Sequence, residues 1–251
     1  MIWLKKGFLA KKLNNAIFTS NGRKKPSLKP LTLNAYQRLV DNSVILEEDG
    51  HGLKVLETSD GHIIKIFRQK RVVSSALIKP YAFRFVKNAH ALKKLGIHTV
   101  DVVDMFYCPP IKRTLVKYRP IPGKNLRSVL HSSLQFDVIM ESFVRFFSEL
   151  HDKGIFFRSI HLNNVIISDD SNQLGLIDFA DMKIYSKGLS RAMRLRNFKH
   201  LTRYKADQES IKNFGVDRFI DMYFSSSSLP ESYKPEFLNE LQKALETEGR
   251  V

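Results

Sequence analysis

One lysine in a short β-type run has the placement of an anion-binding side chain. Lys65 lies in the middle of the run His62–Phe67, where strand alternation puts it on the face opposite Ile64 and Ile66. A lysine on the inner face of a small sheet is costly unless it meets an anion. The alternative is an edge strand from which the lysine points to water.

Two further residues have the types that bind a metal ion. Asn164 precedes the strand-type run Val165–Ser168, and Asp178 follows the returning run Leu174–Ile177. A hairpin made of these runs would bring the two residues together. Amide and carboxylate oxygens are hard ligands suited to Mg²⁺, which keeps waters and substrate phosphates in its shell. Asn and Asp at strand ends also serve as turn formers, and that alternative stays open.

The elements that must position these residues are mainly strands in the first half of the chain and mainly helices in the second half. We expect strands first, at residues 44–46, 53–58, 62–67, 100–106 and 114–118, with one helical stretch at 74–95. A chain break at Pro120–Gly123 follows. Beyond it we expect the hairpin and helices at 136–153, 189–203, 208–224 and 234–246.

This order predicts an α+β, two-lobed fold. The predicted parts are a basic N-terminal extension (1–30), an N-lobe with a small antiparallel sheet (31–119) and a mainly helical C-lobe (120–251).

Composition excludes several classes of protein. The 251 residues are 43% hydrophobic and 26% charged, which is enough apolar material for a core and excludes wholesale disorder. Cys108 is the single cysteine, so a disulfide framework is excluded and a reducing compartment fits. No stretch approaches the roughly 18 uninterrupted apolar residues of a membrane span. The net charge of +16 indicates an anionic partner.

The basic residues concentrate in three acid-free stretches. Residues 1–30, 61–100 and 182–205 hold eight, nine and eight Lys or Arg residues. Because unpaired cationic groups are not buried, we expect these side chains to face water or an anion. They form either ordinary solvated surface or a shared face toward an anionic substrate or membrane. Met1–Phe18 mixes lysines with apolar residues, so it either lies in a bilayer interface or packs on the domain.

The order and spacing of these pieces resemble the protein-kinase-like superfamily. The run "LVKYRPIPGKNL" (115–126) is similar to its hinge, "GIFFRSIHLNNVII" (154–167) to its catalytic loop, and "LGLIDFADMKI" (174–184) to its metal-binding strand and turn. Together with the basic segment Leu189–Tyr204, these motifs most resemble the bacterial lipopolysaccharide core kinases. That group, of Kdo and heptose kinases, includes the toluene-tolerance-type proteins. The resemblance covers roughly residues 40–205.

The resemblance implies ATP and Mg²⁺ as cofactors and assigns roles to residues of this chain. Lys65 would contact the α- and β-phosphates, Asp178 would hold Mg²⁺, and Asn164 would supply a second ligand position. The remaining nucleotide-binding candidates are Gly50 and Gly52 in the phosphate-covering loop, and Val116 and Tyr118 beside the adenine.

Two departures from the family pattern affect the chemistry. Ser159 stands where the catalytic base Asp belongs, and a serine hydroxyl does not accept a proton at neutral pH as a carboxylate does. His161 is a candidate substitute for the base, or it only shapes the loop. No Asp or Glu occurs from Gly61 to Val100, so the usual Lys–Glu pair cannot form there. Asn88, Asp101 and Asp104 stay open as partners of Lys65.

The expected function is ATP-dependent phosphorylation of a Kdo or heptose hydroxyl in the lipopolysaccharide inner core. The expected partners are the lipopolysaccharide core or a lipid A precursor and an anionic membrane surface, at the cytoplasmic face of the inner membrane. Five basic residues would face the acceptor: Arg191, Arg194, Arg196, Lys199 and Arg203. The alternative is a pseudokinase that acts in envelope biogenesis or stress tolerance. Specific nucleic-acid binding is not expected, because the sequence has no zinc motif, clear helix-turn-helix or RNA-binding aromatic signature.

Overall fold

The computed structural model describes residues 27–68 and 80–250. These residues divide into two compact units, one containing 27–68, 80–89 and 100–120 and the other 90–99 and 121–250. The predicted segment Met1–Phe18 lies outside the described residues, and so do most of the predicted extension 1–30 and the first part of the helix expected at 74–95.

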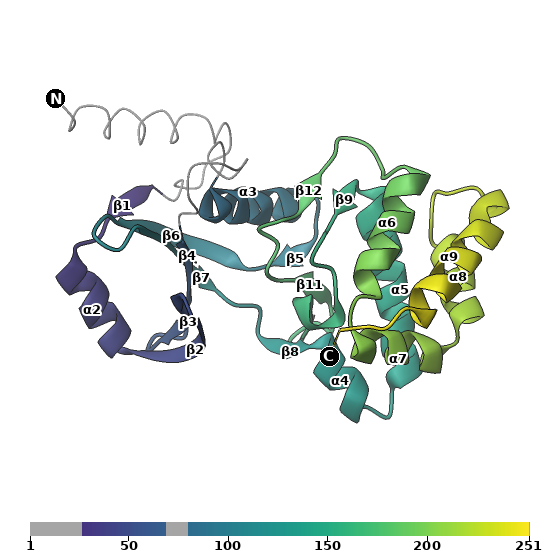
Figure 1. Ribbon diagram of the computed structural model, residues 1–251, viewed down its shortest axis with the longest axis horizontal. Helices are drawn as coiled ribbons and strands as arrows, with labels where there is room; N and C mark the ends of the chain where they lie inside the picture. The colour runs from purple at the N-terminus through teal and green to yellow at the C-terminus, as the bar shows by residue number, and fades with distance from the viewer. Residues whose placement is uncertain (1–26, 69–79, 251) are drawn as a thin grey trace. The chain divides into compact units, whose positions relative to one another are not determined.

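The first unit is built on a six-stranded sheet with the order β1-β6-β7-β4-β3-β2 (Figure 1). All neighbours are antiparallel except β1 and β6. The strands are β1 (Leu28–Pro30), β2 (Ser43–Asp49), β3 (Gly52–Thr58), β4 (Ile63–Arg68), β6 (Asp101–Cys108) and β7 (Arg113–Arg119). The strands expected at 44–46, 53–58 and 62–67 are therefore confirmed as successive antiparallel strands, with Lys65 in the third.

The two faces of this sheet have different helical cover. Ile64 and Ile66 belong to a buried cluster on which side chains of α2 (Leu33–Asp41) pack. Phe67 shares the opposite face with Lys65 and lies 5.8 Å, between ring centroids, from Phe85 of α3 (Tyr81–Lys94). Because β4 is paired with both β3 and β7, the edge-strand alternative for Lys65 is wrong.

Helix α2 was not expected from the sequence, because it is short. Its beginning has a local cause, since the Thr32 hydroxyl accepts a hydrogen bond from the Ala35 backbone N–H at 3.2 Å.

The second unit combines helices with short strands (Figure 1). The helices are α4 (Leu126–Ser132), α5 (Phe136–Asp152), α6 (Arg191–Leu201), α7 (Lys205–Phe214), α8 (Val216–Ser225) and α9 (Lys234–Glu246). One sheet has the order β5-β11-β10-β8, made of β5 (His98–Thr99), β11 (Leu174–Leu176), β10 (Val165–Ser168) and β8 (Gly123–Asn125). A second pairs β9 (Ile155–Phe156) with β12 (Lys183–Ile184), and two 3₁₀ turns are η2 (Leu162–Asn164) and η3 (Glu231–Tyr233).

The core of this unit is aromatic. The strongly periodic helix α5 is confirmed, and its Phe147 lies 5.2 Å from the Phe198 ring of α6. Phe198 in turn meets Tyr223 of α8 at 4.9 Å and Phe237 of α9 at 5.4 Å. These contacts between rings hold four helices to one another.

The single helix expected over 208–224 is wrong, because α7 and α8 are separate helices. Gly215 lies between them with a φ of 97°, in the left-handed region that favours glycine. Its N–H closes α7 on the Ile211 carbonyl at 3.1 Å, and its carbonyl accepts the first bond of α8 from Phe219 at 2.9 Å. The apolar periodicity continues across the break, so it did not reveal two helices.

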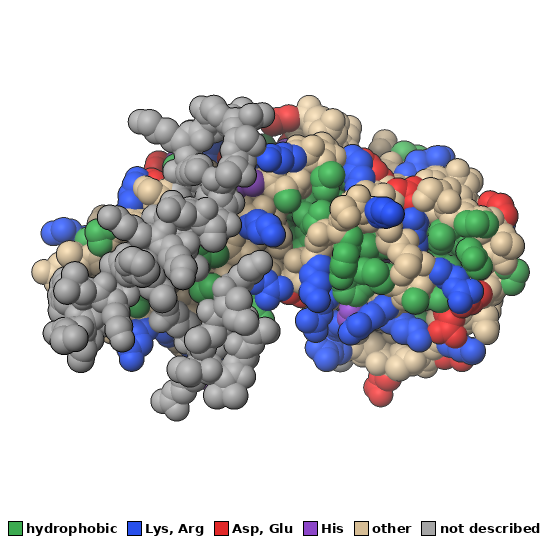
Figure 2. All heavy atoms as spheres, turned by 90° about the horizontal axis from the view of Figure 1, so that it is seen from above, with side chains coloured by type: hydrophobic (Ala, Val, Ile, Leu, Met, Phe, Trp, Pro, Cys, Tyr) green, Lys and Arg blue, Asp and Glu red, His purple; other side chains and the backbone are tan. Residues whose placement is uncertain are grey.

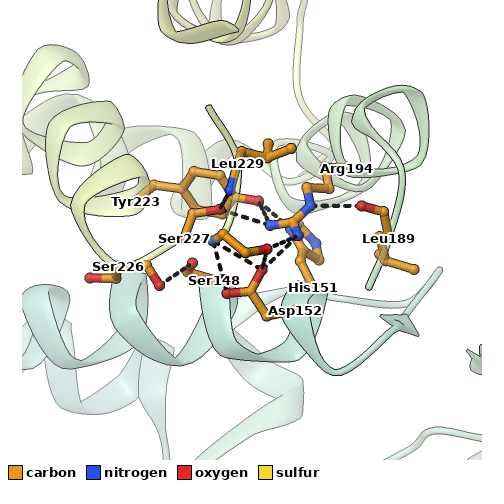
Figure 3. Close-up of polar contacts among 10 residues, drawn as sticks. Ser148, His151, Asp152, Leu189, Arg194, Tyr223, Ser226, Ser227 and Leu229 are labelled. Atoms are coloured by element: carbon orange, nitrogen blue, oxygen red, sulfur yellow. Dashed lines mark hydrogen bonds and ion pairs between the residues drawn. The ribbon is translucent and has the colours of Figure 1, made fainter. Parts of the chain in front are cut away.

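The expectation that every basic side chain of residues 182–205 faces water or an anion is wrong for Arg194. Its side chain is buried, and its Nη2 pairs with Asp152 Oδ1 at 2.6 Å. Its Nη1 donates to the Tyr223 hydroxyl at 3.1 Å, and its Nε donates to the Leu189 carbonyl at 2.9 Å (Figure 3). A guanidinium whose hydrogen bonds and charge are both met can be buried. Arg194 therefore does not face an acceptor.

His151 of α5 belongs to the same network and leads to a pH prediction. Its Nδ1 lies 2.7 Å from the Tyr223 hydroxyl, and its Nε2 lies 3.1 Å from Asn197 Oδ1. Burial, and then the Arg194 charge, lower the pKa of His151 to about 3. The unfolded chain takes up this proton near pH 6.5, so between about pH 3 and 6.5 the unfolded state binds more protons. Acidification over that range therefore destabilises the fold.

We expect His151 to lower the free energy of unfolding by up to about 1.4 kcal/mol per pH unit in that range. Urea unfolding at pH 7, 6 and 5 measures the slope. His151→Gln serves as the comparison. Other groups titrate in both proteins, such as His200, whose pKa burial lowers to about 4. The difference between the two slopes therefore reports on His151. Equal slopes in the two proteins would contradict the prediction.

Candidate functional site

The hairpin β10–β11 brings Asn164 and Asp178 to neighbouring ends of paired strands. Val165 pairs with Leu176, and the Ile177 N–H donates to the Asn164 carbonyl at 3.0 Å. The expected hairpin is thereby confirmed. Asn164 is buried, whereas Asp178 is exposed and has a φ of 52°. This left-handed backbone is one that Asp and Asn adopt more readily than most residues.

The Asn164 side chain is oriented by the loop that precedes it. Its Nδ2 donates to the Ser159 carbonyl at 2.9 Å. This bond uses the amide nitrogen and leaves Oδ1 as the atom with which Asn164 would bind a cation. Together with the Asp178 carboxylate, it gives a set of hard oxygen donors that fits Mg²⁺.

The described residues contain no group of three or more His, Cys, Asp or Glu side chains placed to hold a metal ion by themselves. Mg²⁺ commonly completes its shell with waters and substrate phosphates.

A carboxylate that the sequence argument missed lies against Ser159. The Ser159 hydroxyl donates to Asp181 Oδ2 at 2.6 Å, and both residues are half-buried. Asp181 follows Asp178 by three residues, in the turn after β11. The only signal in the sequence was a second Asp in "DFAD", which by itself is typical of a turn.

A second acid that the sequence did not indicate, Asp207 of α7, is hydrogen-bonded to the same loop. It is fully buried, and its Oδ2 accepts from the Leu162 N–H at 3.1 Å. Its Oδ1 accepts from Arg127 Nε of α4 at 2.8 Å. The buried charge pair thus ties the start of η2 to two helices. Nothing local in the sequence connects these three residues.

His161 lies in the loop between Ser159 and Asn164. Its ring meets that of Tyr204 edge to face, with 5.0 Å between centroids. Burial lowers the pKa of His161, with the Asp207 carboxylate opposing this, so the ring is neutral at pH 7. Among the described residues, Nδ1 has no hydrogen-bond partner. A neutral imidazole can accept a proton, and its packing also shapes the loop, so both interpretations of His161 remain.

Removing the Asp207 charge tests how much of the loop depends on it. We expect Asp207→Asn to lower the free energy of unfolding by about 1.5–3 kcal/mol, because it weakens a charged hydrogen bond in a buried place. Glu209→Gln, an exposed change on the same helix, should stay within about 0.5 kcal/mol. Chemical denaturation of both variants measures this, and equal midpoints would show that Asp207 is dispensable.

The nucleotide-binding candidates of the first unit lie in its sheet. Lys65 pairs with Val55 on one side and Val116 on the other. Gly50 and Gly52 form the tip of the β2–β3 hairpin, where a side-chain Cβ would have no atom within 4 Å. Such an open tip lets backbone approach a ligand closely.

Val116 and Tyr118 lie inside β7 instead of at its end. Val116 is paired with both Lys65 and Met105, and Tyr118 with both Ile63 and Val102. The backbone N–H and C=O groups of a strand with two neighbours form the hydrogen bonds of the sheet. The adenine contact expected of Val116 and Tyr118 stays a prediction.

Fold and site residues together define a mixed α+β protein, with a six-stranded sheet in one unit and mainly helices in the other. The described fold is similar to that of a solved chain, WaaP in complex with acyl carrier protein, with a TM-score of 0.53 and 15% sequence identity. The match covers 84% of this chain and 92% of that one. At this identity the likeness shows the fold.

Comparison by sequence adds no assignment. No protein-family model matches the chain, and no curated protein matches it. Within the described residues, no helix is both long enough and apolar enough to cross a membrane.

Proposed function

We propose that this protein is an ATP- and Mg²⁺-dependent phosphotransferase that phosphorylates a sugar hydroxyl, Kdo or heptose, of the lipopolysaccharide inner core. The observation that carries the proposal is the placement of Asn164 and Asp178 at the open end of the β10–β11 hairpin, where β10 begins and β11 ends. In this proposal the two residues hold Mg²⁺, and Lys65 and the Gly50–Gly52 tip bind the phosphates. Mg²⁺ would neutralise the phosphate charge that builds up during transfer.

The likeness of the fold to WaaP, which was solved in complex with acyl carrier protein, supports this choice. The sequence motifs resemble the lipopolysaccharide core kinases in residue type and spacing, and this support is independent of the fold.

The surface of the second unit suits an anionic acceptor. The exposed basic residues of the segment 182–205 are Lys183, Lys187, Arg191, Arg196, Lys199 and Lys205. Two of them have acidic partners, Arg191 with Glu236 at 3.3 Å and Lys199 with Glu240 at 2.9 Å. Lys and Arg side chains gather over this unit in Figure 2. Phosphates and carboxylates of a lipopolysaccharide core, at the inner face of the inner membrane, would meet such a surface favourably.

Two measurements test the proposal. Addition of ATP with Mg²⁺ should raise the melting temperature above that with Mg²⁺ alone, because a ligand that binds only the folded state stabilises it. Isolated inner-core oligosaccharide should then stimulate release of ADP and become labelled from [γ-³²P]ATP. ADP release that no acceptor stimulates would contradict the proposal.

Ser159 at the base position favours a second candidate, a pseudokinase that acts as a binding factor in envelope biogenesis. Loss of a general base typically slows such a reaction about 10²–10⁴-fold. A pseudokinase would label no acceptor, whether or not ATP with Mg²⁺ raises its melting temperature. The kinase predicts both signals.

A further inference from the structure

The Ser159–Asp181 contact puts a carboxylate where the family pattern lacks one. Ser159 stands at the position of the missing base, and its hydroxyl hydrogen is directed at Asp181 Oδ2 over 2.6 Å. The main chain of the same serine is fixed by Asn164, whose Nδ2 donates to its carbonyl at 2.9 Å. Ser159 therefore contacts the Asp181 carboxylate through its hydroxyl and the Asn164 amide, which would bind the metal, through its carbonyl.

The second oxygen of this carboxylate, Asp181 Oδ1, is buried and lacks a hydrogen-bond donor among the described residues. A buried carboxylate oxygen without a donor is an expensive arrangement. Because this oxygen is closed to solvent, a substrate hydroxyl reaches it only when the Asp181 side chain turns toward the substrate. A hydroxyl placed there would donate to it, and a carboxylate that accepts this hydrogen bond can also accept the proton.

We propose that Asp181 is the proton acceptor for the sugar hydroxyl, and that Ser159 is the positioning residue that holds its carboxylate in place. This inference rests on the proposed function. In the step, the hydroxyl oxygen forms a bond to the γ-phosphorus of ATP, and the bond from that phosphorus to the β–γ bridging oxygen breaks. ADP leaves with the electron pair, and the hydroxyl proton passes to Asp181 Oδ1, from which it is later released to water.

Asp181 suits this step better than His161 does. The ring of His161 is held edge to face against Tyr204. Asp181 instead meets the side chain that occupies the position of the base itself.

The experiment compares Asp181→Asn with two other variants. Asp170→Asn, an exposed change in the turn between β10 and β11, is the matched control. The double variant Ser159→Asp/Asp181→Asn moves the carboxylate to the loop position. Each protein is assayed for kcat with ATP and isolated inner-core oligosaccharide across pH, and for the thermal shift caused by Mg²⁺ and ATP.

We expect Asp181→Asn to lower kcat about 10²–10⁴-fold, to remove the rise of kcat with pH, and to keep the thermal shift. Asp170→Asn should match the wild type, and the double variant should recover part of kcat together with the pH dependence. A merely structural role of Asp181 would lower kcat at all pH values alike and leave the shape of the profile unchanged.

The outcomes separate the two proposals. If the wild type transfers phosphate and Asp181→Asn keeps its kcat and pH profile, the proton-acceptor role is overturned and the proposed function stands. If Asp181→Asn loses the Mg²⁺–ATP shift, Asp181 serves nucleotide binding instead, and the inference is also overturned. If the wild type transfers phosphate to no acceptor, both proposals fall.

Discussion

The Asp178→Asn variant should lose the stabilisation that Mg²⁺ and ATP give to the wild type. The exposed carboxylate beside Asn164 supplies the only formal negative charge that the proposed ligand pair offers the metal, and an amide removes it. At a ligand concentration about 100 times Kd, the wild type should gain about 2.7 kcal/mol in the free energy of unfolding. We expect most of this gain, and phosphate transfer with it, to disappear in Asp178→Asn.

This substitution is suited to the test because it should leave the fold intact. Asp178 has a φ of 52°, and Asn tolerates this region as Asp does. The stability without ligand should therefore change by no more than about 0.5 kcal/mol. Asp170→Asn makes the same change of charge in the neighbouring turn and should keep the full ligand effect. A full thermal shift in Asp178→Asn would remove this residue from the metal site.

The Arg194→Met variant should be the most destabilised of those considered for stability. Arg194 is 1% exposed, and its guanidinium contacts Asp152, Tyr223 and the Leu189 carbonyl. Its removal leaves the half-buried Asp152 carboxylate without its cation and breaks several hydrogen bonds. Breaking such a buried pair costs about 3–5 kcal/mol. The midpoint of urea unfolding should fall with an unchanged m value.

Arg191→Met is the matched control on the same helix. Arg191 is exposed and pairs with Glu236 at 3.3 Å, and surface pairs of this kind contribute at most about 1 kcal/mol. If both variants unfolded at the same denaturant concentration, the buried network would not have the stabilising role that its geometry indicates.

Local pattern was sufficient to predict much of the fold. Alternation around Lys65 predicted β4, and apolar spacing predicted α5, because neighbours in these elements are neighbours in sequence. The runs on either side of residues 169–172 likewise predicted the β10–β11 hairpin that joins Asn164 to Asp178. Each of these results depends on contacts made within a short stretch of chain.

Contacts between distant residues were decided only by the tertiary structure. Arg191 and Arg194 have the same side chain three positions apart, yet one is exposed and the other is buried against Asp152. The partner of Ser159 lies 22 residues away, and Asp207 meets Arg127 across 80 residues. A buried charge needs a partner, because burying it unpaired costs free energy. Only the packing of helices and turns against one another determines which residue that partner is.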